Sequence, residues 1–279
     1  MSKNRICIIG GSVLLGSCFK KVFPENSFSI GRSKDNDYLI NNNVLNSFED
    51  LITPNDLIVH SAWDINLINW ERDNKLDVYF KTLSRNIFSF SKKRKIKCIF
   101  ISTDQVYGEE GPHNEESSTF PLNNYGKVKL ECENLALQSN ASVARLNFLN
   151  RDPKLKKRGW VEKLLIKAKN NEPITLFDNI YFSPCSGIKA AEIIYKLGLM
   201  NLNDTFNIGC KEKFSKSDIA QKILNYLNIK CTTINVKSVV SFPDKINRSK
   251  DLSMDVSKIE NTLNIKLESQ EELIKNIFK

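Results

Sequence analysis

The sequence predicts a doubly wound α/β domain built on a parallel sheet, with a smaller C-terminal lobe that binds substrate. Short runs of apolar residues at 6–9, 57–59 and 98–101 are unbroken by polar side chains. Such runs are typical of parallel strands covered by helices on both faces. Helix-like segments separate the runs, and hydrophobic residues make up 41% of the chain. This content is enough to bury a sizeable core.

The elements follow one another as alternating strands and helices in the first half. In chain order we expect a strand at 6–9, a helix at 13–22, strands at 28–30 and 57–60, a helix at 77–90, a strand at 98–101, and helices at 161–169, 190–199 and 216–227. Ligands of such sheets bind beyond the carboxyl ends of the strands. We assign residues 1–148 to the nucleotide-binding domain and 149–279 mainly to the substrate-binding lobe, with a partial return to the first domain.

Composition excludes several classes of protein. No apolar run approaches the roughly 18 residues that span a bilayer, so no membrane segment is expected. The first run is too short for a signal peptide, which predicts a cytoplasmic chain. The seven cysteines form no Cys-x-x-Cys pair and there are two histidines, so no metal site is expected. The basic runs at 92–95 and 154–158 lack interleaved aromatics, which favours solvated loop ends over a nucleic-acid surface.

The turn at residues 10–16 follows the first strand and reads Gly-Gly-Ser-Val-Leu-Leu-Gly. A glycine-rich turn into a helix directs backbone N–H groups and the positive end of the helix dipole toward a pyrophosphate. Gly10 and Gly16 match the expected spacing, but Val13 stands where the middle glycine lets a phosphate approach the backbone. A plain tight turn also fits these residues. The position between strand and helix favours cofactor binding.

The end of the second strand carries Arg32 and Ser33. A site for NAD usually has a carboxylate at this place, whereas a site for NADP has an arginine for the 2′-phosphate. The pair therefore predicts NADPH as cofactor, with NADH the less favoured choice. The alternative is that Arg32 is an exposed loop arginine.

Tyr125 and Lys129 are four residues apart and therefore share one face of a helix. A phenol with a pKa of about 10 is a poor acid at neutral pH, and an adjacent cation lowers that pKa. Tyr226 and Lys230 repeat the spacing, and we interpret them as a helix end. Thr103 distinguishes the first pair, because it ends an upstream strand and its hydroxyl can bind the carbonyl oxygen that Tyr125 protonates.

These residues lie within two longer segments that carry a family resemblance. Residues 101–108 read Ile-Ser-Thr-Asp-Gln-Val-Tyr-Gly, and residues 121–131 read Pro-Leu-Asn-Asn-Tyr-Gly-Lys-Val-Lys-Leu-Glu. With further matches at 60–63, 182–184, 248 and 252–255, the chain resembles the extended short-chain dehydrogenase/reductases. It is most similar to their dTDP-4-dehydrorhamnose reductase branch of nucleotide-sugar enzymes. The resemblance spans nearly the whole chain and is more specific for the superfamily than for the substrate.

The resemblance implies a role for each matching position. Tyr125 would donate a proton, Lys129 would lower its pKa and hold the nicotinamide ribose, and Thr103 would polarise the substrate carbonyl. The remaining positions implied are Gly10, Ser12 and Leu14 near the pyrophosphate, Ala62 and Trp63 along the adenosine and ribose path, Asp104 and Val106 near the sugar, Phe148 in place of a common indole, and Arg248 near the nucleotide phosphates. The chain departs from the family at Val13, at His60-Ser61 in place of Asn-Ala, at Phe148, and at Ser249 in place of proline.

Together the motifs and the resemblance predict NADPH-dependent reduction of a 4-keto nucleotide-sugar in deoxysugar or surface-polysaccharide biosynthesis. A nucleotide-sugar epimerase or dehydratase is an alternative, although such enzymes usually hold NAD. A non-catalytic regulatory subunit with the same fold is another alternative. Val13 favours that reading, whereas the intact Thr103, Tyr125 and Lys129 oppose it. The expected partner is a nucleotide-diphosphate sugar, and homodimer formation is left open.

Overall fold

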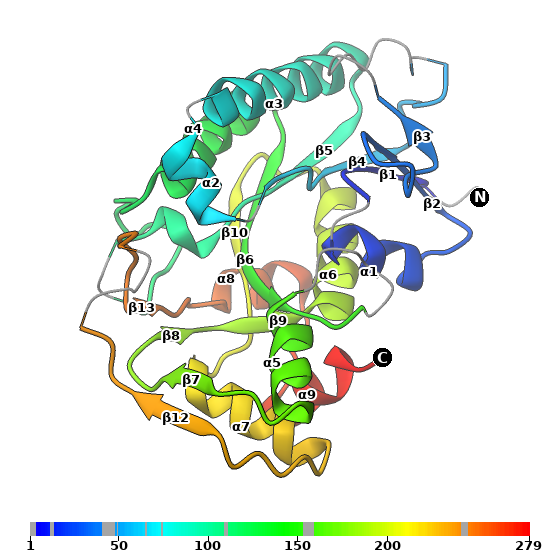
Figure 1. The fold of residues 1–279 in the computed structure, drawn as a ribbon. Coiled ribbons are helices and arrows are strands. Elements are labelled where there is room, and N and C mark those ends of the chain that lie inside the picture. Colours follow the sequence, from blue (N-terminus) through cyan, green and yellow to red (C-terminus); the bar gives the residue numbers. More distant parts are fainter. Residues whose placement is uncertain are drawn as a thin grey trace.

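The central sheet explains the unbroken apolar runs. The computed structural model describes residues 4–11, 14–40, 48, 50–64, 66–73, 75–108, 111–152, 159–240 and 245–279. Within these ranges an eight-stranded parallel sheet has the order β10-β6-β5-β4-β1-β2-β3, with β9 pairing to β6 (Figure 1). Its strands are β1 (Ile6–Ile9), β2 (Ser27–Gly31), β3 (Tyr38–Leu39), β4 (Leu57–His60), β5 (Lys97–Ile101), β6 (Ser142–Leu149), β9 (Pro184–Ser186) and β10 (Thr205–Ile208).

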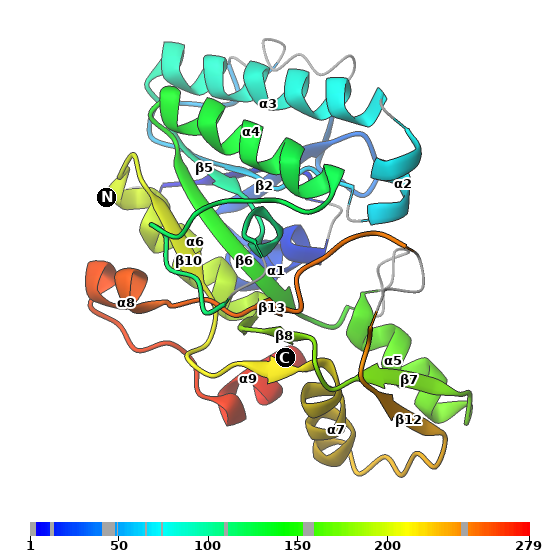
Figure 2. The same cartoon turned by 90° about the vertical axis from the view of Figure 1, so that its left-hand side faces the viewer.

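Helices cover both faces of this sheet. One layer contains α1 (Leu14–Val22) and α6 (Gly187–Met200), and the other contains α2 (Leu67–Arg72), α3 (Lys75–Arg94) and α4 (Asn124–Gln138) (Figure 2). Successive residues of β1 enter opposite cores, since Ile6 and Ile8 pack with α1 and α6 whereas Cys7 and Ile9 pack with α3. Both sides of each strand are therefore apolar, as the sequence predicted.

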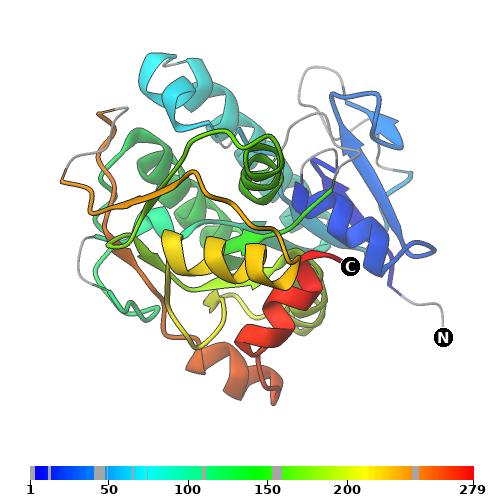
Figure 3. The same cartoon turned by 60° about the horizontal axis from the view of Figure 1, so that its bottom comes forward.

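The second half of the chain forms a lobe with small sheets of its own, and it also supplies β10 to the main sheet. In the lobe β7 (Ile174–Phe177) pairs with β12 (Ile234–Lys237), and β8 (Tyr181–Phe182) lies between β11 (Phe214–Ser215) and β13 (Asp251–Leu252). Its core is built by α5 (Trp160–Lys169), α7 (Lys216–Tyr226) and α9 (Gln270–Ile277). Figure 3 shows α7 (yellow) and α9 (red) next to each other. The helix α8 (Ser257–Leu263) packs against β10.

The predicted fold class, a doubly wound parallel sheet with a smaller lobe, is confirmed. The proposed division after residue 148 falls at the end of β6. No helix within the described ranges combines the length and the apolar character that crossing a bilayer requires.

Candidate functional site

The carboxyl end of β5 carries the first functional side chains. After Ile101 the chain turns into a 3-10 helix, η2 (Asp104–Val106), for which Thr103 is the N-cap. The Thr103 hydroxyl accepts a hydrogen bond from the Gln105 amide at 3.3 Å and donates one to Asp104 Oδ1 at 3.0 Å. Thr103 is 6% exposed, so this hydroxyl is held in one place at the end of the strand.

The start of α4 is fixed against the same 3-10 helix. The side chain of Asn123 caps α4 by accepting from the Gly126 amide at 2.9 Å, and its Nδ2 donates to Gln105 Oε1 at 3.1 Å. A Cβ on Gly126 would overlap the carbonyl oxygen of Gln105, so a glycine is required for this close approach. This arrangement places the Tyr125 side chain close enough to the Thr103 side chain to interact with it.

The pKa of Tyr125 is raised from its ordinary value, because burial outweighs the interaction with Thr103 that lowers it. The sequence predicted the opposite shift, with Lys129 lowering this pKa. The structure shows why this prediction is wrong. Lys129 Nζ donates to the backbone oxygen of Ile101 at 2.6 Å and lies 3.8 Å from the centre of the Trp63 ring. Burial lowers the pKa of Lys129 itself to about 7.

The glycine-rich turn lies beside the ends of β2 and β4. Gly10 has a φ of +97°, and a Cβ there would lie 2.5 Å from Ala62 Cα, so the predicted cofactor residues Gly10 and Ala62 are in tight contact. Gly16 packs against Gly11 at the start of α1. Leu14 begins this helix. The predicted residues Ser12 and Val13 lie outside the described residues.

Arg32 follows the end of β2, next to the turn, since the Gly10 amide donates to the Ile30 oxygen at 2.8 Å. Its side chain is exposed, and the guanidinium lies 4.8 Å from the centre of the Tyr79 ring. Ser33 donates to Asp35 Oδ2 at 2.8 Å. A glycine turn at Gly10 and Gly11 beside an exposed arginine fits a dinucleotide that carries a 2′-phosphate.

Trp63, predicted to line the ribose path, is 8% exposed and packs in an aromatic cluster. Its ring stacks on Trp70 at 5.4 Å and on Phe80 at 4.7 Å. The indole Nε1 is buried and has no hydrogen-bond partner among the described residues. The cluster also contains His60, whose pKa burial lowers to about 3. His60 is therefore a neutral core residue at physiological pH.

The four predicted substrate residues are placed differently. Asp104 is 2% exposed, and its Oδ2 accepts from Asn147 Nδ2 at 2.7 Å. Phe148 and Arg248 are partly exposed, the first on β6 and the second before β13. Val106 is fully buried in the hydrophobic core. The structure therefore contradicts a substrate contact by the Val106 side chain, because η2 turns it into the core.

Two residues near Asp104 were not predicted. Asn147 lies on β6, and Lys216 begins α7 in the second lobe, close enough for Asp104 to raise its pKa. A single asparagine in a strand and a single lysine at a helix start carry no sequence signal, because only the fold brings them to Asp104.

The second Tyr-x-x-x-Lys segment has the role that the sequence predicted. Tyr226 is the last residue of α7, is 50% exposed, and stacks on Phe278 at 5.6 Å. It is a helix end, whereas the Tyr125 side chain interacts with a threonine at the end of a strand.

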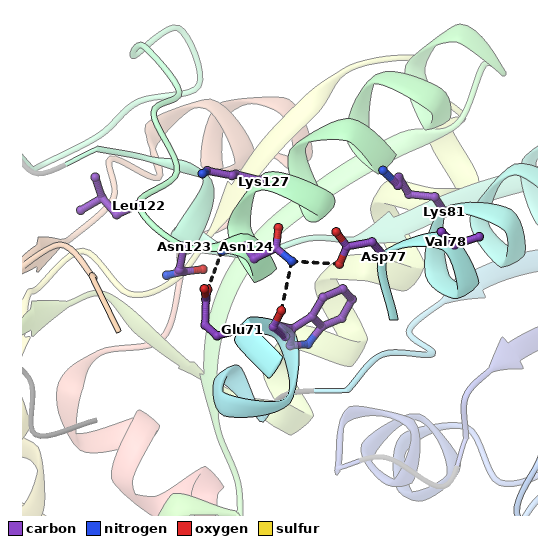
Figure 4. A pocket seen from close by; sticks show the side chains of 9 residues that line it. Glu71, Asp77, Val78, Lys81, Leu122, Asn123, Asn124 and Lys127 are labelled. Atoms are coloured by element: carbon purple, nitrogen blue, oxygen red, sulfur yellow. Dashed lines mark hydrogen bonds between the residues drawn. The ribbon is translucent and has the colours of Figure 1, made fainter. Parts of the chain in front are cut away.

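A pocket of about 540 Å³ lies where α2, α3 and the start of α4 meet (Figure 4). Its wall is braced by Asn124, whose amide N donates to Glu71 Oε1 at 2.8 Å and whose Nδ2 donates to Asp77 Oδ1 at 2.9 Å. Nδ2 also donates to the Trp70 oxygen at 3.1 Å. These bonds fix the first turn of α4 and thereby the position of Tyr125.

The geometry of fold and site agrees with one protein family. The family model described as RmlD substrate binding domain matches residues 4–279. The chain belongs to this family. A solved relative of the RmlD fold is the dTDP-4-dehydrorhamnose reductase of Bacillus anthracis in complex with NADP, with a TM-score of 0.85, 20% identity, and coverage of 99% of this chain and 98% of that chain. The resemblance predicted from the sequence is confirmed.

Two curated relatives of this RmlD-family chain carry the name of a subunit and not of a reductase. The methionine adenosyltransferase 2 subunit beta of Xenopus laevis is 31% identical over 189 residues, which cover 64% of this chain and 54% of that protein. The subunit of the same name from Pongo abelii is 26% identical over 291 residues, covering 92% of this chain and 82% of that protein. The chain thus spans only about half of the Xenopus protein.

Proposed function

We propose that the protein is an NADPH-dependent reductase of a 4-keto nucleotide-sugar, acting in deoxysugar or surface-polysaccharide biosynthesis. The observation that carries this proposal is the pair of neighbouring, interacting hydroxyls of Thr103 and Tyr125 at the carboxyl end of β5. In a doubly wound sheet this edge is where ligands bind. The glycine turn and Arg32 lie at the same edge, after β1 and β2.

Each group has a task in this reaction. The turn at Gly10, the start of α1 and Arg32 would hold the dinucleotide, which when bound supplies a hydride. Thr103 would orient the sugar carbonyl, and Tyr125 would donate a proton to the oxygen. The raised pKa keeps the Tyr125 phenol protonated at neutral pH, so its proton is available, and makes the phenol a weaker acid than an ordinary tyrosine. General acid catalysis of this kind contributes on the order of 10²- to 10⁴-fold.

The test is NADPH oxidation against a panel of 4-keto nucleotide-sugars, with two tyrosine variants. Tyr125→Phe should lower turnover by about 10²- to 10⁴-fold and leave the Kd for NADPH unchanged. Tyr226→Phe is the matched control, since that ring lies at a helix end, and it should retain wild-type turnover. Equal losses in the two variants would show that α4 does not carry the proton donor. An epimerase or dehydratase would convert sugar without net NADPH oxidation.

A second candidate is a non-catalytic regulatory subunit. Two observations favour it, namely the name of the Xenopus and Pongo relatives and the hydrogen bond that turns Lys129 toward Ile101. This candidate predicts no turnover with any 4-keto sugar and a complex with a methionine adenosyltransferase catalytic subunit in gel filtration. Turnover that depends on Tyr125 would exclude it.

A further inference from the structure

Lys216 is an unusual lysine at the junction of the two lobes. It is the first residue of α7, where Ser215 and Asp218 form a capping box and the Lys216 amide donates to the Ile180 oxygen at 3.1 Å. Its backbone is therefore held rigidly. The ammonium lies 3.5 Å from the centre of the Phe182 ring and 5.3 Å from that of Trp160. The side chain is only partly exposed.

A neighbouring lysine shows what is missing at Lys216. Lys213 also lies over an aromatic ring, that of Tyr181 at 4.7 Å, but its ammonium pairs with Asp251 at 2.9 Å. Within the described parts of the chain, the Lys216 ammonium forms no hydrogen bond. Burial lowers its pKa to about 8, against the opposing charge of Asp104. A partly buried cation without a hydrogen-bond acceptor is costly unless a ligand supplies one.

Asp104 offers the complementary group on the first lobe. Its carboxylate accepts from Thr103 at 3.0 Å and from Asn147 at 2.7 Å. A carboxylate has about four acceptor positions, so further donors can be bound. Because Thr103 also interacts with Tyr125, the polar groups run from the proton donor to the edge of the second lobe.

We propose that Lys216 and Asp104 bind one hydroxyl of the substrate's hexose ring, with Lys216 determining specificity for that hydroxyl. The ammonium donates to the hydroxyl oxygen, and the hydroxyl donates to the carboxylate. The inference rests on the proposed function, in that the substrate is a nucleotide-sugar. A phosphate fits less well, because the Asp104 carboxylate would repel it, whereas the aromatic rings of Trp160 and Phe182 suit the C–H groups of a sugar.

The test compares binding of dTDP with binding of dTDP-glucose and dTDP-rhamnose by calorimetry, and repeats it with the UDP pair UDP and UDP-glucose. Lys216→Met removes the charge and keeps the side chain's length. The substitution should weaken the binding of the sugar nucleotide by about 10- to 150-fold, the range for a hydrogen bond to a charged group. Binding of the free nucleoside diphosphate and of NADPH should be unchanged, which also shows that the variant is folded. Lys216→Arg should restore part of the sugar affinity.

The control variant is Lys213→Met, which should change none of these affinities. Equal weakening of the diphosphate and the sugar nucleotide by Lys216→Met would assign Lys216 to a phosphate and overturn the inference. Unchanged sugar affinity in Lys216→Met would also overturn it, as would equal wild-type affinities for the diphosphate and its sugar ester. The readout is binding, so absence of turnover would refute the proposed reductase and leave a Lys216-dependent sugar affinity as evidence for the subsite.

Discussion

Arg145 and Lys129 are two buried cations near the end of β5. Their surroundings shift their pKa values in opposite directions. Arg145 Nη2 donates to Glu133 Oε2 at 2.7 Å and its Nη1 donates to the Tyr107 hydroxyl at 2.9 Å. Burial opposes the charge, but Glu133 outweighs it and the pKa of Arg145 is raised. Lys129 has a backbone oxygen and aromatic rings as its contacts, and burial lowers its pKa to about 7.

The difference shows how much depends on the position of one carboxylate, that of Glu133. It holds the proton on Arg145, which it contacts, and does not offset burial at Lys129, which it does not contact. Glu133 follows Lys129 by one turn of α4, yet its oxygens bind Arg145 and also accept from Ser102. Lys129 receives only a weaker electrostatic contribution from Glu133. A buried cation left without a direct carboxylate destabilises the fold, and such groups are concentrated at functional sites. On this argument Arg145 serves the fold, whereas Lys129 marks the candidate functional site.

The largest effect on stability should come from Glu133→Gln. Removing one partner of a buried ion pair leaves an uncompensated charge and costs about 3–5 kcal/mol. Glu131→Gln is the matched control on the same helix, because Glu131 pairs with Lys81 at 3.0 Å with side chains 56% and 31% exposed. An exposed pair contributes about 0–1 kcal/mol. Urea unfolding of both variants measures the difference.

Similar small losses in the two variants would contradict the comparison, since Arg145 would then be stable without its carboxylate. A loss of unfolding free energy confined to Glu133→Gln would support the comparison between Arg145 and Lys129. The Arg145→Met variant would then measure the cost of leaving the Glu133 carboxylate unpaired. Because Met removes the guanidinium that needs Glu133, leaving the carboxylate alone, a loss of similar size is expected.

Lys129→Met should change how stability depends on pH. The pKa of Lys129 is about 7 in the folded protein against an ordinary 10.5. Between these values the unfolded chain binds a proton that the folded chain has released, so the free energy of unfolding rises with pH. Below pH 7 both states are protonated and this contribution is flat. From pH 7 to 9 the wild type should gain about 2 kcal/mol relative to the variant.

Urea unfolding at pH 6, 7, 8 and 9 provides this measurement, with Lys127→Met as the control because Lys127 is exposed on the same helix. Parallel profiles for wild type and Lys129→Met would mean that Lys129 keeps its proton in the folded protein. The contrast with Arg145 would then be lost.

These two cations also show how far the sequence could predict the structure. The unbroken apolar strands β1, β4 and β5 identified the fold class, and their ends located Thr103. The strand β6 was not predicted, because Arg145 and Asn147 interrupt its apolar pattern. Arg145 is buried there only because α4 brings Glu133 to it. That contact is tertiary and leaves no periodic pattern in the sequence.

The same reason limits what could be predicted of the site. The spacing of Tyr125 and Lys129 placed both on one helix, but it could not show that Lys129 turns to Ile101. Val106 lies two residues from Asp104, yet the 3-10 helix directs it into the core. Strands β8, β11 and β13 have two residues each, too few for a periodicity, so Lys216 could not be placed near Asp104 from sequence.

The smallest effect on stability should come from Arg32→Ala, which extends the comparison to an exposed cation. Arg32 lies over Tyr79 at 4.8 Å, and an exposed contact of this kind contributes about 0.5–1 kcal/mol. The midpoint temperature of thermal unfolding should therefore change little.

The same variant tests whether the Arg32 guanidinium binds the 2′-phosphate of NADPH. If it does, its loss should weaken the binding of NADPH by about 10- to 150-fold and leave the affinity for NADH unchanged. Calorimetry with both cofactors on wild type, Arg32→Ala and the exposed neighbour variant Lys34→Ala measures this. Equal affinities of wild type for NADPH and NADH, unchanged by Arg32→Ala, would show that Arg32 is an ordinary surface residue. A selective loss of affinity for NADPH, with the thermal stability of the protein nearly unchanged, would place Arg32 with Lys129 among the cations that the fold does not need.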